Sequence, residues 1–273
     1  MFKNKFIKQL LVLSTLGLLV LSGCSSTGKD DKVIRVGAST TPHAIILEAA
    51  RGAVEAAGYT LEIVEFTDYI LPNTTLDAGD LDANYFQHLP YLTTFNEKNN
   101  TELTGVLPVH FEPLGIYPGK ASSLEAIEAG NATIAIPNDP TNEARALALL
   151  VDLGYITLKA GTSSNATPLD IESNPYNIQF VEIEAALLVS VLKDVELAII
   201  NGNYALGGGV ASSVIVTEDK NSVAAQTFAN LLVVRIGTEE SEKTKVLIAA
   251  LKSESVKQFI LDTFSPTVVP LLD

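Results

Sequence analysis

The sequence predicts an α/β fold made of two lobes with a ligand cleft between them. Strand-like runs rich in β-branched residues alternate with helix-like runs of about 10 to 15 residues, which is typical of βαβ units and largely parallel sheets. The alternation occurs in two blocks joined by extended segments, so each block predicts a sheet of its own. The 273 residues are enough for two packed cores.

The first block begins with a β-branched strand and a helix of small and apolar residues that Gly58 ends. The next strand is predicted because apolar and polar residues alternate along it. The expected elements are a strand at 33–38, a helix at 44–57, a strand at 59–66, a polar turn at 77–82, a short helix at 90–99, and a strand-rich run at 103–117 that prolines interrupt.

The second block repeats this rhythm, and the chain then closes with two strands and two helices. A helix that stops at Gly154 is the clearest of these elements. The expected helices are 123–129, 140–153, 184–193 and two between 239 and 264, and the expected strands are 132–136, 178–183, 195–200, 214–217 and 231–236. We place lobe 1 at 33–112 plus 222–273 and lobe 2 at 113–221.

The N-terminus predicts export and a lipid anchor. Three lysines precede an aliphatic run at 10–21, which is shorter than the ~20 residues of a membrane-spanning helix. Residues 1–23 therefore form a signal peptide. They end in Leu-Ser-Gly before Cys24, a pattern that resembles the bacterial lipobox, so we expect Cys24 to be lipidated. The polar residues 24–32 form a tether, and the protein is expected on the extracytoplasmic face of the cell membrane.

The charge balance and the missing motifs exclude several classes of function. With 18 Lys and Arg against 32 Asp and Glu, the net charge of −14 argues against a nucleic-acid partner. The chain has one cysteine, so no disulfide forms within it. The sequence has no phosphate-binding loop, nucleophile elbow or zinc-protease motif. His88 and His110 are too weak a pair to predict a metal site. We expect no enzyme activity, no cofactor and no metal.

A polar stretch follows the strand at 132–136 and begins the next helix. Asp139 suits the N-cap of that helix and Pro140 its first turn. Arg145 follows within an apolar stretch of the same helix, and its guanidinium can pair bidentately with a carboxylate. An ordinary capped helix with a surface arginine is the alternative. The apolar neighbours of Arg145 favour a buried partner, such as an anionic ligand.

Two asparagines and an aromatic group complete the candidate site. Asn201 follows a strand and Asn230 precedes one, and each amide offers both a donor and an acceptor. They suit a ligand that carries an ammonium beside a carboxylate, although either could be a turn residue. The ring-bearing residues could line a pocket for an apolar side chain, or form plain core; they are Tyr69, Phe86, His88 and Tyr91.

Four segments carry a resemblance to a known family: 66–73, 80–88, 137–142 and 198–204, which read FTDYILPN, DLDANYFQH, PNDPTN and AIINGNY. In them the chain resembles the NlpA/MetQ family, lipoprotein substrate-binding components of methionine-type ABC importers. The resemblance implies a periplasmic-binding-protein-like fold, type II-like, that binds methionine and delivers it to a permease with its ATPase subunit. The chain departs from the family pattern at residues 184–191, a segment that is unusually apolar here.

The resemblance also implies a role for each candidate residue. The rings of Tyr69, Phe86, His88 and Tyr91 would enclose the ligand side chain, Arg145 would bind its carboxylate, and Asn201 and Asn230 would hold its ammonium and carboxylate. Another amino acid or a methionine-containing dipeptide is the main alternative ligand. A surface lipoprotein without a transport role is the alternative in another class.

Overall fold

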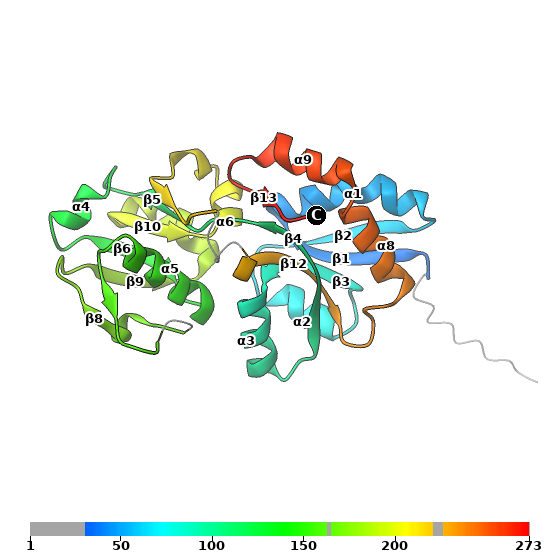
Figure 1. The fold of residues 1–273 in the computed structure, drawn as a ribbon, viewed down its shortest axis with the longest axis horizontal. Coiled ribbons are helices and arrows are strands. Elements are labelled where there is room, and N and C mark those ends of the chain that lie inside the picture. The colour runs from blue at the N-terminus through cyan, green and yellow to red at the C-terminus, as the bar shows by residue number, and fades with distance from the viewer. Residues whose placement is uncertain (1–30, 163–164, 221–225, 273) are drawn as a thin grey trace, which may run out of the picture. The chain divides into compact units, whose positions relative to one another are not determined.

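The computed structural model describes residues 31–162, 165–220 and 226–272, whose strands form two large sheets (Figure 1). The predicted signal peptide, Cys24 and most of the predicted tether lie outside the described residues. Within the described part of the chain, none of the helices is long and apolar enough to cross a bilayer.

The first sheet has six strands in the order β13-β4-β12-β3-β1-β2. β1 pairs in parallel with both β2 and β3, whereas β12 is antiparallel to β3 and β4. The strands are β1 Val33–Ser39, β2 Thr60–Phe66, β3 Ala83–His88, β4 Leu103–Phe111, β12 Ala229–Arg235 and β13 Val269–Pro270. The helices beside them are α1 Ile45–Ala56, α2 Leu71–Asp77, α3 Leu89–Asn99, α8 Glu242–Leu251 and α9 Glu254–Phe264.

Both faces of this sheet are buried, and the side-chain alternation of β12 shows how. Leu232 and Val234 pack in one core with side chains of α1, α8 and α9, which lie together on one side of the sheet in Figure 1. Leu231 and Val233 point the other way, into a core that α2 and α3 complete. A strand that is apolar at successive positions is therefore required here.

The second sheet has five strands in the order β11-β5-β10-β6-β9, with β10, β6 and β9 parallel and β5 antiparallel to β10. Leu197 and Ile199 of β10 face the core that holds α5, and Ala198 and Ile200 face the opposite core. The elements are β5 Gly115–Pro118, β6 Thr133–Pro137, β9 Gln179–Ile183, β10 Leu197–Ile200, β11 Val216–Thr217, α4 Glu125–Glu128, α5 Pro140–Asp152 and α6 Gly202–Gly207, with a hairpin of β7 Thr157–Leu158 and β8 Ile171–Ser173.

The chain passes between the two sheets twice. Every strand of the first sheet lies within 33–111 or 229–270, and every strand of the second lies within 115–217. The outward connection is 112–114, between β4 and β5, and the return follows β11. The prediction of two α/β halves is confirmed. The lobe boundaries, 33–112 plus 222–273 and 113–221, stay a prediction.

Two expectations differ from the structure. The sheets are mixed rather than largely parallel. In the first sheet, β12 returns from the second half and is antiparallel to both neighbours, and in the second sheet, β5 is antiparallel to β10 and β11. The helix expected at 184–193 is a run of tight 3-10 turns, Ala185–Asp194. Val189 and Val191 are β-branched, and the Ser190 hydroxyl donates to the Leu187 carbonyl at 2.6 Å, both of which weaken an α-helix.

Two glycines provide a matched test of how closely the chain packs, because one lies against backbone atoms and the other faces open space. A Cβ on Gly119 would lie within 2.5 Å of the carbonyl oxygens of Val195 and Leu192, whereas a Cβ on Gly52, in α1, would meet nothing within 4 Å. We expect Gly119→Ala to lower the free energy of unfolding by ~1–3 kcal/mol through overpacking. Gly52→Ala should raise it by ~0.5–1 kcal/mol through helix propensity. Urea titrations of both variants check this, and equal effects would contradict the close approach at Gly119.

Candidate functional site

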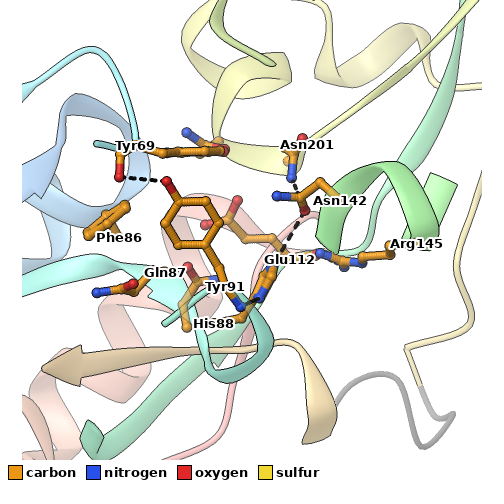
Figure 2. A pocket seen from close by; sticks show the side chains of 12 residues that line it. Tyr69, Phe86, Gln87, His88, Tyr91, Glu112, Asn142, Arg145 and Asn201 are labelled. Atoms are coloured by element: carbon orange, nitrogen blue, oxygen red, sulfur yellow. Dashed lines mark hydrogen bonds between the residues drawn. The ribbon is translucent and has the colours of Figure 1, made fainter. Parts of the chain in front are cut away.

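A cavity of about 350 Å³ lies among residues that both sheets and their helices contribute (Figure 2). Most of its residues lie at the end of β3, follow β2, β4 or β10, or lie in the first turns of α5 and α6. The cavity is lined by Tyr69, Phe86, Gln87, His88, Tyr91, Glu112, Asn142, Arg145, Asn201, Gly202, Asn203 and Asn230.

All seven residues that the sequence put forward for ligand binding line this one cavity. Five further residues were missed. Asn142 lies in the polar stretch before Arg145, and Asn203 lies two residues after Asn201, so proximity could have indicated both. Glu112 follows a strand directly before Pro113, a position that could also have been noted. Gln87 and Gly202 complete the missed set.

One wall of the cavity is aromatic. The ring of Tyr69 lies 5.9 Å from that of Phe86 and 5.7 Å from that of Tyr91, between ring centroids. The Tyr91 hydroxyl donates to the Tyr69 carbonyl at 2.9 Å, and the Tyr69 hydroxyl donates to Oδ1 of Asn203 at 2.6 Å. Burial raises the pKa of both phenols, so they remain neutral. This wall can receive an apolar or sulfur-containing side chain.

Asn142 connects residues from both halves. Asp139 caps α5, as predicted, by accepting from the backbone N–H of Asn142 at 3.0 Å, and its carboxylate also accepts from the Asn142 amide. Oδ1 of Asn142 then accepts from Asn201 Nδ2 at 2.8 Å and lies 3.2 Å from His88 Nε2. These contacts fix the amide of Asn142 between the two halves.

His88 is a neutral donor at this point. Its Nδ1 accepts from the backbone N–H of Tyr91 at 3.2 Å, so its proton lies on Nε2 and is donated to Asn142. Burial, with the nearby Arg145 cation, lowers the pKa of His88 to about 3. His88 therefore caps α3 and orients Asn142 without adding charge to the cavity.

Arg145 has a protein partner that the sequence did not indicate. Its Nε donates to Oε1 of Glu218 at 2.8 Å, and its Nη2 donates to Oε2 at 2.6 Å. Nη2 also donates to the Glu112 carbonyl at 2.9 Å, and the Phe228 ring lies 4.3 Å from the guanidinium. Of its nitrogens, Nη1 has no hydrogen-bond partner among the described residues.

Glu112 is the acidic group of the cavity, and two histidines lie behind it. His110 Nε2 is 2.6 Å from Oε1 of Glu112, and Tyr85 hydrogen-bonds Nδ1 of the same ring. His43 Nε2 lies 3.0 Å from Oδ1 of Asn230 and 3.5 Å from Oε1 of Glu112. Burial lowers the pKa of His43 to about 4 and of His110 to about 3, so both rings are neutral donors toward these oxygens.

The charge of Glu112 is set by opposing effects. Burial has the largest effect and raises the pKa of this carboxyl above its usual value, although His43, Arg145 and the backbone N–H of Asn203 act in the opposite direction. Gly202 packs against the same side chain, since a Cβ there would lie 2.8 Å from Cβ of Glu112. A bound cation would add to the groups that favour the carboxylate.

Two details bear on what this site can hold. His43, His110 and Glu112 bring potential metal-ligand atoms within 4.8 Å of one another. The imidazole N–H of His110 already donates to Glu112, so this set is arranged as a hydrogen-bond network rather than as open ligands. In the cavity wall, Oδ1 of Asn201 is buried and has no hydrogen-bond partner within the described part of the chain, which leaves an acceptor for a ligand.

Comparison with known proteins places these features in a family. A family model described as NlpA lipoprotein matches residues 34–272. Membrane lipoprotein TpN32 of Treponema pallidum is 37% identical over 96% of both chains. The D-methionine-binding lipoprotein MetQ of Salmonella typhi is 39% identical over 88% of this chain and 89% of its own.

A solved structure extends the similarity to three dimensions. The nutrient binding protein of Burkholderia cenocepacia bound to methionine aligns with a TM-score of 0.82 and 38% identity, over 87% of this chain and 99% of its own. This similarity confirms the predicted two-lobe, periplasmic-binding-protein-like fold.

Glu143 is a buried acid of α5 outside the cavity. It is 6% exposed, and its Oε1 has no hydrogen-bond partner among the residues that the structure describes. Burial, together with the neighbouring carboxylates of Glu182, Asp139 and Asp170, raises the pKa of Glu143 to about 7. The folded protein thus holds a proton between pH ~4.5 and ~7 that the unfolded chain has released.

We expect Glu143→Gln to stabilise the protein at pH 8 relative to wild type, with an advantage that shrinks as the pH falls to 5. The free energy of unfolding of wild type falls as the pH rises from ~4.5 to about 7, because the unfolded chain releases this proton before the folded protein does, and the amide avoids that loss. Glu182→Gln should follow the same trend because it removes the nearest like charge. Urea midpoints at pH 5 and pH 8 measure this, and a pH-independent difference would contradict it.

Proposed function

This chain belongs to the NlpA lipoprotein family, and we propose that it is the substrate-binding component of an ABC importer that takes up methionine. Methionine binds in the cavity between the two halves, and the loaded protein presents it to the permease and its ATPase subunit. The relatives are consistent with this ligand, since one is named a D-methionine-binding lipoprotein and another was solved bound to methionine.

The observation that carries the proposal is the presence of a carboxyl group, a guanidinium and an aromatic wall in one cavity. Glu112 and the unpartnered Oδ1 of Asn201 offer acceptors for an ammonium. Arg145 offers Nη1 and Asn230 its amide N–H to a carboxylate. A zwitterion requires such a pair of subsites, because a buried charge without a partner is strongly unfavourable.

The third part of the ligand would lie against the aromatic wall. In Figure 2, Tyr69 and Phe86 lie on the side of the cavity opposite Asn142, Asn201 and Arg145. A ligand whose charged groups bind at the polar side therefore directs its side chain toward the rings. Contacts between a thioether and aromatic rings contribute about 0.3–1.5 kcal/mol, which favours methionine over an aliphatic chain of equal length.

Ligand binding would stabilise the contact between the halves. The Tyr69 hydroxyl already donates to Asn203, and the Tyr204 hydroxyl donates to the Thr67 carbonyl at 3.1 Å. A ligand that contacts Arg145 and Asn201 on one half and Asn230 on the other adds to these links. It thereby shifts the population toward the closed state that we propose the permease recognises.

The anchor and location belong to the same proposal. Lipidation of Cys24 would hold the protein at the extracytoplasmic face of the cell membrane, and the residues up to Lys32 would act as a tether. Because a single acyl chain binds a membrane only marginally, we propose that more than one chain is attached.

The proposal is tested by calorimetric titration of protein that begins after Cys24 and has been stripped of ligand by unfolding and refolding. L-methionine, D-methionine, other amino acids and methionine dipeptides form the panel. We expect methionine to bind with a micromolar or lower dissociation constant, and Arg145→Ala to weaken it by roughly tenfold or more. If another amino acid binds and methionine does not, the assignment of methionine as the ligand is wrong. If the folded protein binds no member of the panel, the transport role is rejected.

The ammonium subsite has its own test. We expect Glu112→Gln to weaken methionine binding by roughly tenfold or more, because a charge-assisted contact becomes a neutral one. The deaminated acid of methionine has no ammonium, so its affinity should change much less. Competition titrations with both ligands compare the two losses. An equal loss for both would remove Glu112 from the ammonium subsite.

A further inference from the structure

Glu218 is the least expected contact of the site. It lies directly after β11, 73 residues from Arg145 in the chain, and both its oxygens accept from that guanidinium. The side chains of Arg145 and Glu218 are only 4% and 9% exposed. None of the features that predicted the site from the sequence included Glu218.

The same carboxylate also joins the two connections between the sheets. Oε2 of Glu218 accepts from the backbone N–H of Leu114 at 2.8 Å, and the backbone N–H of Glu218 donates to the Leu114 carbonyl at 3.0 Å. Leu114 ends the outward connection, whereas Glu218 begins the return. Arg145 in turn donates to the Glu112 carbonyl on the outward side. The ion pair of Arg145 and Glu218 therefore contacts both of the segments that connect the two sheets.

This arrangement limits how Arg145 can meet a ligand. Glu218 occupies the edge formed by Nε and Nη2, which is the edge that would otherwise hold a carboxylate bidentately. Nη2 is used again by the Glu112 carbonyl. Of the guanidinium nitrogens, Nη1 remains without a hydrogen bond to the described residues. A ligand carboxylate can then contact Arg145 through Nη1 while Glu218 stays in place.

We propose that Glu218 is the positioning residue of the carboxylate subsite. It orients the Arg145 guanidinium so that Nη1 faces the ligand carboxylate, and it links that subsite to both interlobe connections. The inference rests on the proposed function, because it requires a ligand with a carboxylate at Arg145.

The physical reason is preorganisation. A free arginine side chain has many rotamers, and fixing one of them on binding reduces affinity. The bidentate contact to Glu218 and the Phe228 ring fix the guanidinium before the ligand arrives. The ion pair also gives the buried guanidinium a partner of opposite charge, and a buried arginine without such a partner would destabilise the fold. A different role is conceivable for the same contact: Glu218 could compete with the ligand for Arg145, and the two roles predict opposite changes.

The test compares Glu218→Gln with wild type against two ligands, methionine and methioninamide. The amide ligand keeps the ammonium and the thioether but has no carboxylate. We expect Glu218→Gln to weaken methionine by about tenfold and methioninamide by less than about twofold, because only the former depends on an oriented Arg145. Glu218→Asp keeps the charge with a shorter reach and should give an intermediate loss for methionine.

Glu196→Gln is the matched control. Its carboxylate also accepts a backbone N–H in the second half, from Thr133 at 2.8 Å, but it does not contact Arg145. We expect unchanged affinity for both ligands. Thermal melting establishes that each variant is folded, and if Glu218→Gln does not fold, Glu218→Asp carries the same comparison.

The outcomes separate this inference from the proposed function. Equal loss of both ligands in the Glu218 variants would show a general structural role and overturn the inference. Unchanged or tighter methionine binding would also overturn it, the latter in favour of competition for Arg145. In those cases wild type still binds methionine and the proposed function stands. If folded wild type binds no ligand of the amino-acid panel, both fail together.

Discussion

The buried ion pair of Arg145 and Glu218 is the contact on which the arrangement of the site depends. A guanidinium in an apolar helix must have a partner, since an unpaired buried charge would strongly destabilise the fold. Here the partner lies on the segment that leaves the second sheet, and it also binds Leu114 on the segment that enters it. The guanidinium that we propose binds the carboxylate of a zwitterionic ligand is thus held where the two halves connect.

In the rest of the cavity, uncharged side chains surround and orient the polar groups. His43 and His110 lie behind Glu112, with their pKa values lowered by burial, and act as uncharged donors rather than as cations. His88 and Asn201 orient the Asn142 amide. One acid and one arginine remain as the acidic and basic groups of the cavity wall, on a scaffold of amides and rings that comes from both halves. Such a site suits a small zwitterion with an apolar side chain.

Much of this could be predicted from the sequence, because the signals were local. The Asp139 cap, the alternation of strands and helices and the seven cavity residues all depend on short stretches of chain. The partner of Arg145 could not be predicted: its apolar helix indicated that a buried anion was needed, but nothing local identified Glu218 rather than a ligand. Antiparallel insertion of β12 and the 3-10 turns of Ala185–Asp194 likewise depend on tertiary packing.

The most direct measurement is the affinity of wild-type protein for methionine, for methioninamide and for the deaminated acid of methionine, by calorimetry under one set of conditions. Recognition of a zwitterion by two separate subsites predicts that each analogue binds roughly tenfold or more weakly than methionine. Methioninamide loses the contact of the carboxylate with Arg145, and the deaminated acid loses the contact of the ammonium with Glu112. Equal affinity for methionine and either analogue would contradict the assignment of Arg145 or Glu112 to the corresponding subsite.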